Sequence, residues 1–399
     1  MNKKIRILFH TQYYPPEIGA PQSRLSELAQ ELAMIGFEVS VLTAMPNYPT
    51  GKTFPGYKGL FRKENLEGIT VYRSYIYPTQ SSGLFKRLLN YFSFVCSSFW
   101  VGILLSKPDF LITESPPLFL GISGYVLSRI KGAKWIFNVA DLWPTSVVEL
   151  GVIKKNGFLY QVSQKMESFF YHKAIIVTGQ SKTILQSITD RYPDIPTYHF
   201  SNGVNPEKYT SQAKTKDGKI RVMYAGLHGL AQGLDQIVAA AEILKNHTNL
   251  EFVLIGDGPE KQNLIKQTKS AGISNITFLD PIPKSEIPEA LASADILIVP
   301  LKLQLTGAVP SKLYEAMAAS KPVVLIAESE AAEIVCNADC GVVVKPGDIE
   351  KLASEIQHFA AHPEERIRLG KNGRNAVIEK YDRIKITKEF SEFLQDLSL

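Results

Sequence analysis

The sequence predicts an α/β protein with two doubly wound parallel sheets, each in its own domain. Short apolar runs alternate with stretches of helical periodicity along most of the 399 residues. The alternation of strand and helix patterns stops between residues 201 and 218. These residues are polar and rich in turn formers, so the linker between the domains is expected there. The length also favours two domains, since most domains hold roughly 100–200 residues.

The first series of elements begins at the N-terminus. Residues 5–10 are expected to form a strand, and the helix that follows begins at Pro21 and ends at Gly36. Further strands are expected at residues 38–44, 69–75, 110–114, 134–141 and 174–180. Alternation with helices makes this sheet parallel, with helices on both faces.

The second series follows the linker. Its strands are expected at residues 219–226, 251–255, 276–279, 295–301 and 322–326, with 341–345 as a candidate sixth. After Asp348 the pattern is helical to the end of the chain.

Residues 84–105 are the most hydrophobic segment and are long enough to cross a membrane. Polar residues interrupt the segment, and strands on both sides of it belong to one predicted sheet. A core helix and a membrane-contacting helix are therefore both favoured over a true span. In the second case Lys86 and Arg87 are placed to meet lipid phosphates.

The composition is that of an ordinary soluble protein, with 45% hydrophobic and 21% charged residues. A formal charge of +5 allows an anionic partner but is too weak to indicate nucleic acid. Only the first four residues resemble a signal peptide, and Cys96, Cys336 and Cys340 form no zinc set. We therefore expect a cytoplasmic protein with reduced thiols.

The segment 306–328 carries the best candidate site. A helix beginning near Pro310 lies between two buried strands, so its N-terminus is expected at the carboxyl edge of the sheet. Lys312 and Glu315 are three residues apart and can both face that edge. A lysine suits a phosphate there, and a carboxylate can accept hydrogen bonds from a ribose diol. The alternative is a solvated ion pair on an ordinary helix.

Glycine-rich turns also follow predicted strands, and free N–H groups in such turns can hold phosphate. They contain Gly19 and Ala20; Gly226, His228 and Gly229; and Gly256 and Asp257. None matches a dinucleotide fingerprint or a Walker loop, and each glycine could equally serve a turn or close packing.

Asp141 follows a buried strand of the first domain and could orient or deprotonate a substrate hydroxyl. Its alternative role is helix N-capping before Pro144. No Asp-x-Asp motif occurs, and no His/Asp cluster at ligand spacing was identified. No metal is therefore expected.

Taken in order, these pieces resemble glycosyltransferase family 4. The similarity rests on YYPPEIGAPQSRLSELAQEL, DLWPTSVVELG, YAGLHGLAQGLD, IGDGPEKQNL and PSKLYEAMAASKPVV, and it covers nearly the whole chain. The subgroup most resembled comprises the amino-sugar (fucosamine-type) transferases of O-antigen and capsule assembly.

The resemblance implies a GT-B fold, with two Rossmann-like domains facing a cleft. Residues 1–204 would bind the acceptor, residues 205–380 would bind the nucleotide sugar, and residues 381–399 would form a helix packing back on the first domain. It also implies retaining, metal-independent transfer without a cofactor. Glu315 would hold the ribose, Lys312 and the turn from Gly226 the diphosphate, and the loop around Ile282 the base.

The expected donor is a UDP-linked N-acetylated amino sugar, and the expected acceptor is a polyprenyl-diphosphate-linked saccharide. Residues 84–105 would face the inner leaflet of the membrane. Alternatives are a sugar-nucleotide epimerase of the same shape, or a non-catalytic module that binds sugar nucleotide or lipid. The chain departs from the wider family at Gly307, where a Glu is usual, and at Ala140, where a His is common.

Overall fold

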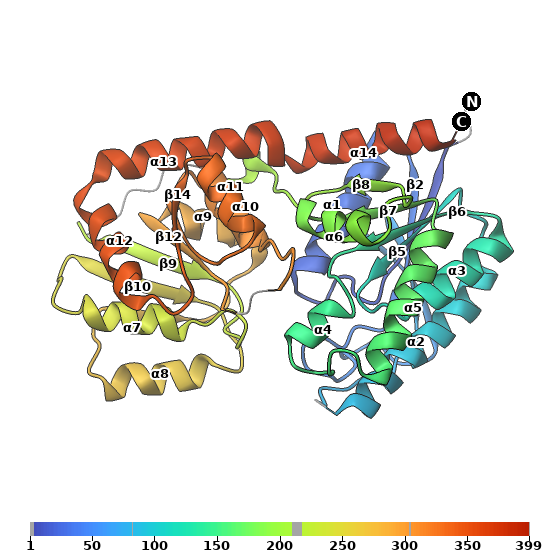
Figure 1. The fold of residues 1–399 in the computed structure, drawn as a ribbon, viewed down its shortest axis with the longest axis horizontal. Coiled ribbons are helices and arrows are strands. Elements are labelled where there is room, and N and C mark those ends of the chain that lie inside the picture. The colour runs from blue at the N-terminus through green and yellow to red at the C-terminus, as the bar shows by residue number, and fades with distance from the viewer. Residues whose placement is uncertain (1–3, 82, 210–217, 303–304, 399) are drawn as a thin grey trace. The chain divides into compact units, whose positions relative to one another are not determined.

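The computed structural model describes residues 4–81, 83–209, 218–302 and 305–398. The chain divides into two compact units, one of residues 1–201 with 384–399 and the other of residues 202–383. Each unit contains one sheet, and Figure 1 labels many of the helices and strands.

The sheet of the first unit has eight strands in the order β3-β4-β2-β1-β5-β6-β7-β8. Its strands are β1 (Arg6–His10), β2 (Glu38–Ala44), β3 (Phe61–Leu66), β4 (Ile69–Ser74), β5 (Phe110–Ser115), β6 (Lys134–Val139), β7 (Ile176–Gly179) and β8 (Thr197–His199). Its helices are α1 (Ala20–Ile35), α2 (Leu84–Leu104), α3 (Leu120–Lys131), α4 (Thr145–Glu149), α5 (Phe158–Lys173), α6 (Lys182–Arg191) and the C-terminal α14 (Arg383–Ser398).

Helices cover both faces of this sheet. One core cluster joins the sheet to α1 and to Phe390 and Leu394 of α14. The cluster on the opposite face includes Val101 of α2, Leu127 of α3 and Phe170 of α5. The C-terminal helix thus packs on the first unit, where Phe393 stacks on Tyr198 with ring centroids 4.3 Å apart.

The sheet of the second unit has six strands in the order β11-β10-β9-β12-β13-β14, and every neighbouring pair is parallel. Its strands are β9 (Ile220–Ala225), β10 (Leu250–Ile255), β11 (Ile276–Leu279), β12 (Ile296–Pro300), β13 (Val323–Ile326) and β14 (Gly341–Val344). Its α-helices are α7 (Asp235–Ile243), α8 (Lys261–Ser270), α9 (Ile287–Ala292), α10 (Ser311–Ala318), α11 (Glu330–Asn337), α12 (Ile349–Ala361) and α13 (Pro363–Ala376). Short helical turns η1 (Pro206–Lys208), η2 (Lys284–Glu286) and η3 (Val377–Tyr381) complete the unit.

The two predicted parallel sheets are confirmed, including the sixth strand of the second unit, β14. Two strands were not predicted from the sequence: β3, which pairs antiparallel with β4 at the sheet edge, and the three-residue β8. The helical pattern expected after Asp348 is confirmed, and it is divided among α12, α13, the turn η3 and α14. Part of the predicted linker, residues 210–217, lies outside the described residues.

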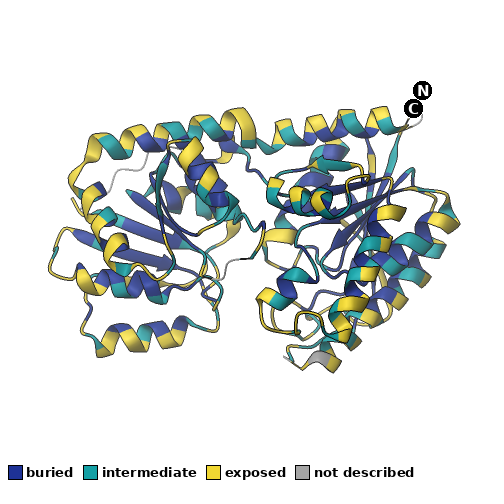
Figure 2. Cartoon of the chain, viewed as in Figure 1, coloured by how far each residue is buried: buried dark blue, intermediate teal, exposed yellow. Residues whose placement is uncertain are grey.

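The helix α2 packs against the rest of the first unit with one side and exposes residues on the other. It is the one described helix that is long and apolar enough to cross a membrane, and a third (33%) of that apolar stretch is buried. It packs against α3, β2 and β4 on one side. Figure 2 shows exposed residues along its length.

Candidate functional site

The carboxyl ends of β9 and β12 meet the N-terminal half of α10 in the second unit. A small pocket there is lined by residues of these three elements and of α9: Met223, Ala225, Leu291, Leu297, Ile298, Val299, Lys312, Glu315 and Ala316. Lys312 and Glu315 are both half-buried, which differs from a fully solvated surface pair. The structure therefore brings the two residues singled out from the sequence to one pocket.

Gly226 makes room for the side chain of Lys312. A Cβ at Gly226 would lie 2.6 Å from Nζ of Lys312 and closer still to its Cε. Gly226 has a φ of +158°, which also favours glycine. The ammonium of Lys312 is thus held beside the turn after β9, where a phosphate could approach it.

The turn after β10 packs closely against the turn after β9, and this explains why glycine occurs at positions 256 and 258. A Cβ at Gly258 would meet the backbone of His228 at 2.6–2.8 Å, and one at Gly256 would meet the carbonyl carbon of Gly226 at 2.9 Å. The N–H groups of Gly226 and His228 donate to the carbonyls of Ile255 and Asp257, both at 2.8 Å. These two N–H groups are therefore already used within the fold, and Gly256 and Asp257 form part of the support for the first turn.

His228 is buried in this turn, and neither of its ring nitrogens has a hydrogen-bond partner within the described residues. Burial, followed by the positive charge of Lys261, lowers the pKa of His228 to about 4, although Asp257 acts in the opposite direction. The imidazole is consequently neutral at physiological pH. One of its ring nitrogens can therefore donate a hydrogen bond, and the other can accept one.

The structural role of Lys261 was not predicted from the sequence. Its Nζ donates to the carbonyls of Gly256 and Leu279, at 2.9 and 3.0 Å, and to Oδ1 of Asp280 at 2.8 Å. This cation joins the turn after β10 to the loop after β11, which contains Ile282. Ile282 itself is half-buried and packs against the core cluster that contains Leu291 and Leu313.

Asp141, Gly19 and Ala20 belong to the first unit, where they follow the carboxyl ends of β6 and β1. Burial, followed by the charge of Glu149, raises the pKa of Asp141. The capping alternative for Asp141 is wrong, because Pro144 occupies the N-cap of α4 and no side chain caps it. Ala20 is the first residue of α1, and Gly19 is its N-cap.

The buried charged residues Glu17, Arg24 and Glu114 were not predicted to be important, because their partners are distant in sequence. Glu17 accepts from the N–H groups of Asn47 and Tyr48, at 2.7 and 2.8 Å. Arg24 donates to Glu114 at 2.5 Å, and Glu114 also accepts from Asn138 at 2.9 Å. The contacts of Glu17 tie the loop that follows β1 to the loop that follows β2, and the contacts of Glu114 tie α1 to the ends of β5 and β6.

Comparisons with known proteins agree with this architecture. Residues 206–376 match the model of "Glycosyl transferases group 1", and residues 19–201 match the model of the "Glycosyl transferase 4-like domain". Together the two models account for most of both units. The fold and its two matched domains define a GT-B protein. The chain belongs to the family 4 glycosyltransferases.

A relative of similar length is the protein provisionally assigned as the colanic acid biosynthesis glycosyl transferase WcaI of Escherichia coli (strain K12). It is 26% identical, over 98% of this chain and 100% of its own. Among solved structures, the sucrose-phosphate synthase of Thermosynechococcus elongatus has a TM-score of 0.77 at 17% identity, covering 98% of this chain and 99% of its own. Alr3699/HepE of Anabaena, solved in complex with UDP, has a TM-score of 0.73 at 16% identity, covering 98% and 100%.

Proposed function

We propose that this glycosyltransferase moves an N-acetylated amino sugar from a UDP-linked donor to a polyprenyl-diphosphate-linked saccharide during synthesis of a cell-surface polysaccharide. The observation that carries the proposal is the pocket in which Lys312 and Glu315 meet the carboxyl ends of β9 and β12. The complex of Alr3699/HepE with UDP supports the choice of nucleotide. The name given to the relative WcaI supports the biosynthetic role.

In this proposal Lys312 binds the diphosphate and stabilises the negative charge that develops as the nucleotide leaves. Glu315 accepts hydrogen bonds from the ribose hydroxyls. The neutral His228 offers a hydrogen bond from the turn beside Lys312, without adding a second positive charge. Transfer needs no metal in this scheme, since Lys312 and helix N-termini supply the positive potential.

Gly307 has a φ of +77°, a conformation that strongly favours glycine. A glutamate at this position, as in the wider family, would therefore be strained. We propose that the departing phosphate itself takes the proton of the acceptor hydroxyl, which removes the need for that carboxylate. Asp141 would orient the acceptor hydroxyl from the first unit.

Peripheral binding to the cytoplasmic face of the membrane is the second part of the proposal. The exposed side of α2 carries an apolar stripe at helical spacing, made of Phe85, Leu89, Phe92, Cys96, Trp100 and Leu104. Trp100 and Leu104 are 68% and 84% exposed. Lys86 and Arg87 lie in the first turn of the same helix, where they can meet anionic headgroups.

The test is release of UDP from a panel of UDP-linked N-acetylated sugars, with and without a polyprenyl-diphosphate saccharide in vesicles. The proposal expects release that depends on the acceptor, and label in the lipid fraction. Lys312→Met and Glu315→Gln should both lose this activity, whereas Lys266→Met on the exposed surface of α8 should keep it. Conversion of the donor to an epimer without acceptor would identify an epimerase. Binding without turnover of any donor would identify a binding module.

A further inference from the structure

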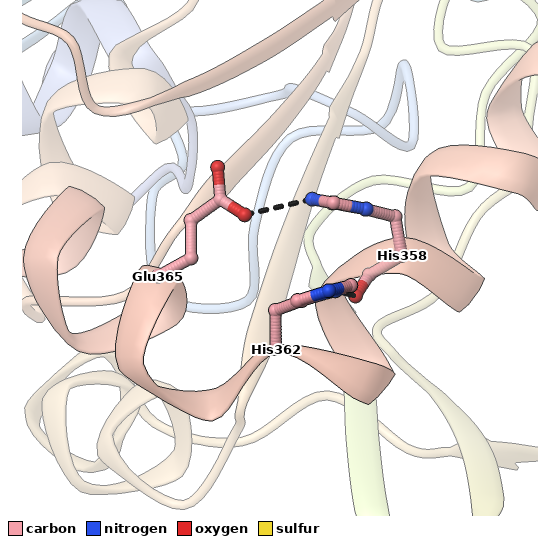
Figure 3. Close-up of side chains that lie close together, drawn as sticks. All are labelled: His358, His362 and Glu365. Atoms are coloured by element: carbon pink, nitrogen blue, oxygen red, sulfur yellow. Dashed lines mark hydrogen bonds and ion pairs between the residues drawn. The ribbon is translucent and has the colours of Figure 1, made fainter.

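Two histidines and a glutamate gather where α12 meets α13, on the second unit (Figure 3). His358 lies in the last turn of α12, His362 is the residue between the two helices, and Glu365 lies in the first turn of α13. One ligand atom from each residue lies within 4.8 Å of the others. The sequence analysis identified no such cluster, and this was wrong, because the His-x-x-x-His spacing was overlooked.

The ring of His362 is already oriented as in a metal site. Its Nδ1 lies 2.7 Å from the carbonyl oxygen of His358. A carbonyl only accepts, so Nδ1 carries a hydrogen, and in the neutral ring the lone pair is on Nε2. A hydrogen bond from the second ring nitrogen to a backbone carbonyl is the arrangement that fixes many metal-binding histidines.

The other two side chains face each other. Nε2 of His358 lies 2.7 Å from Oε2 of Glu365, so a hydrogen now bridges two atoms that can both bind a cation. The rings of His358 and His362 are stacked, with centroids 4.1 Å apart, and Figure 3 shows one ring nitrogen of His358 pointing to Glu365. A cation would displace the bridging proton and draw the three ligand atoms together.

The charge around the cluster permits one cation. All three side chains are at least partly exposed, so a bound ion keeps access to water for its remaining ligands. Among the described residues, two cations lie nearby. Arg368 has its NH2 4.0 Å from Oε1 of Glu365, the oxygen that does not face His358. Arg366 donates to the carbonyl of Ala360 at 3.1 Å. Arg368 also pairs with Asp339, which offsets part of its charge. Repulsion from Arg368 reduces the affinity of the cluster but leaves Oε2 available.

We propose that His358, His362 and Glu365 bind one divalent transition cation of the Zn²⁺ type, with water completing its coordination. Imidazole nitrogen suits such cations, whereas Mg²⁺ prefers oxygen ligands. Bound metal would join the end of α12 to the start of α13 across Pro363. The donor pocket contains no residue of α12 or α13, so this site is separate from the proposed catalytic function.

The test is a calorimetric titration of the tag-free chain with Zn²⁺. Thermal unfolding is then measured with and without Zn²⁺. Exposed Cys96 and Cys336 are changed to serine in every sample, so that thiolates do not contribute. The variants are His358→Ala, His362→Ala and Glu365→Gln. His172→Ala is the matched control, because Nδ1 of His172 also contacts a backbone carbonyl four residues earlier, that of Ser168, at 2.6 Å. His172 belongs to no three-residue ligand group in the described part of the chain.

The expected result is one Zn²⁺ per chain, a higher unfolding temperature with Zn²⁺ than without, and no effect of Mg²⁺. Each of the three variants should bind Zn²⁺ at least about tenfold more weakly, a loss typical of a damaged metal site. The His172→Ala control should bind as the parent does. Parent-like affinity in any one of the three variants would overturn the proposed ligand set. Circular dichroism of the metal-free variants checks that they remain folded.

Discussion

The side chain of Lys312 crosses the backbone of Gly226 so closely that a Cβ at Gly226 would stand 2.6 Å from its Nζ. This relationship joins α10 to the turn after β9, two elements that are distant in sequence. It holds the ammonium at the carboxyl edge of the sheet, where parallel α/β folds bind ligands.

Gly226→Ala should displace Lys312 and weaken binding of UDP. Loss of one charge-assisted hydrogen bond costs about 1.5–3 kcal/mol, or roughly a tenfold to hundredfold rise in Kd. Gly272→Ala is the control, because Gly272 also has a positive φ, of +61°, but a Cβ there meets nothing within 4 Å. Equal affinity of Gly226→Ala and the parent, measured by calorimetry, would contradict a role for Lys312 in binding.

Lys261→Met should destabilise the second unit. The change leaves the carbonyl of Gly256 without its lysine donor, and an unpaired buried group costs about 1–3 kcal/mol. The carbonyl of Leu279 also loses the lysine but still accepts from the N–H of Gly256 at 3.2 Å. Chemical unfolding should therefore show a lower midpoint than for Lys266→Met, whose lysine is exposed on the same helix. Equal midpoints for the two variants would show that Lys261 does not hold these loops.

The stability of the chain should fall in mild acid because of His228. Its pKa is about 4 in the folded chain and about 6.5 in the unfolded chain, so the unfolded state binds more protons between these values. The contribution of the neutral His228 to the free energy of unfolding is therefore fully present above pH 6.5, and it decreases as the pH falls towards 4. His228→Gln should flatten this part of the profile, and His172→Gln should not. An unchanged slope in His228→Gln would contradict the buried, neutral state of this ring.

Asp141→Asn should increase stability near neutral pH. Burial raises the pKa of Asp141 in the folded chain, so its ionised form disfavours folding at a pH above that raised value. The gain should disappear below the unfolded pKa, where the acid is neutral in both states. If Asp141 orients the acceptor, the same variant should lose transfer activity while keeping UDP affinity. Lower stability of Asp141→Asn at neutral pH would argue against a buried carboxylate.

Trp100→Glu on α2 should reduce binding to vesicles that contain anionic lipid. An apolar side chain that enters the membrane contributes about 1.5–3 kcal/mol, so one such change should lower partitioning by roughly tenfold or more. Ile367→Glu is the control, since Ile367 is 65% exposed on α13, outside the proposed membrane surface. Sedimentation of all three chains with vesicles measures the effect. Equal binding of parent and Trp100→Glu would contradict contact through α2.

The regular rhythm of strands and helices was sufficient to predict both sheets, because buried parallel strands form continuous apolar runs. Lys312 and Glu315 were found because a helix N-terminus between two such strands marks the carboxyl edge. The roles of Lys261 and Glu114 depend on partners far along the chain, which local patterns do not reveal. The short strand β8 and the edge strand β3 lack apolar runs, so periodicity could not identify them.

Calorimetric titration with UDP is the measurement that tests the central assignment most directly. The account predicts that UDP binds the parent chain and that GDP, ADP and dTDP bind more weakly. It also predicts that Lys312→Met and Glu315→Gln each lose at least about tenfold in affinity, equivalent to 1.4 kcal/mol. Thermal shift can report the same binding, because ligand at 100 times its Kd adds about 2.7 kcal/mol of stability. Unchanged UDP affinity in both variants would show that the donor does not bind beside Lys312 and Glu315.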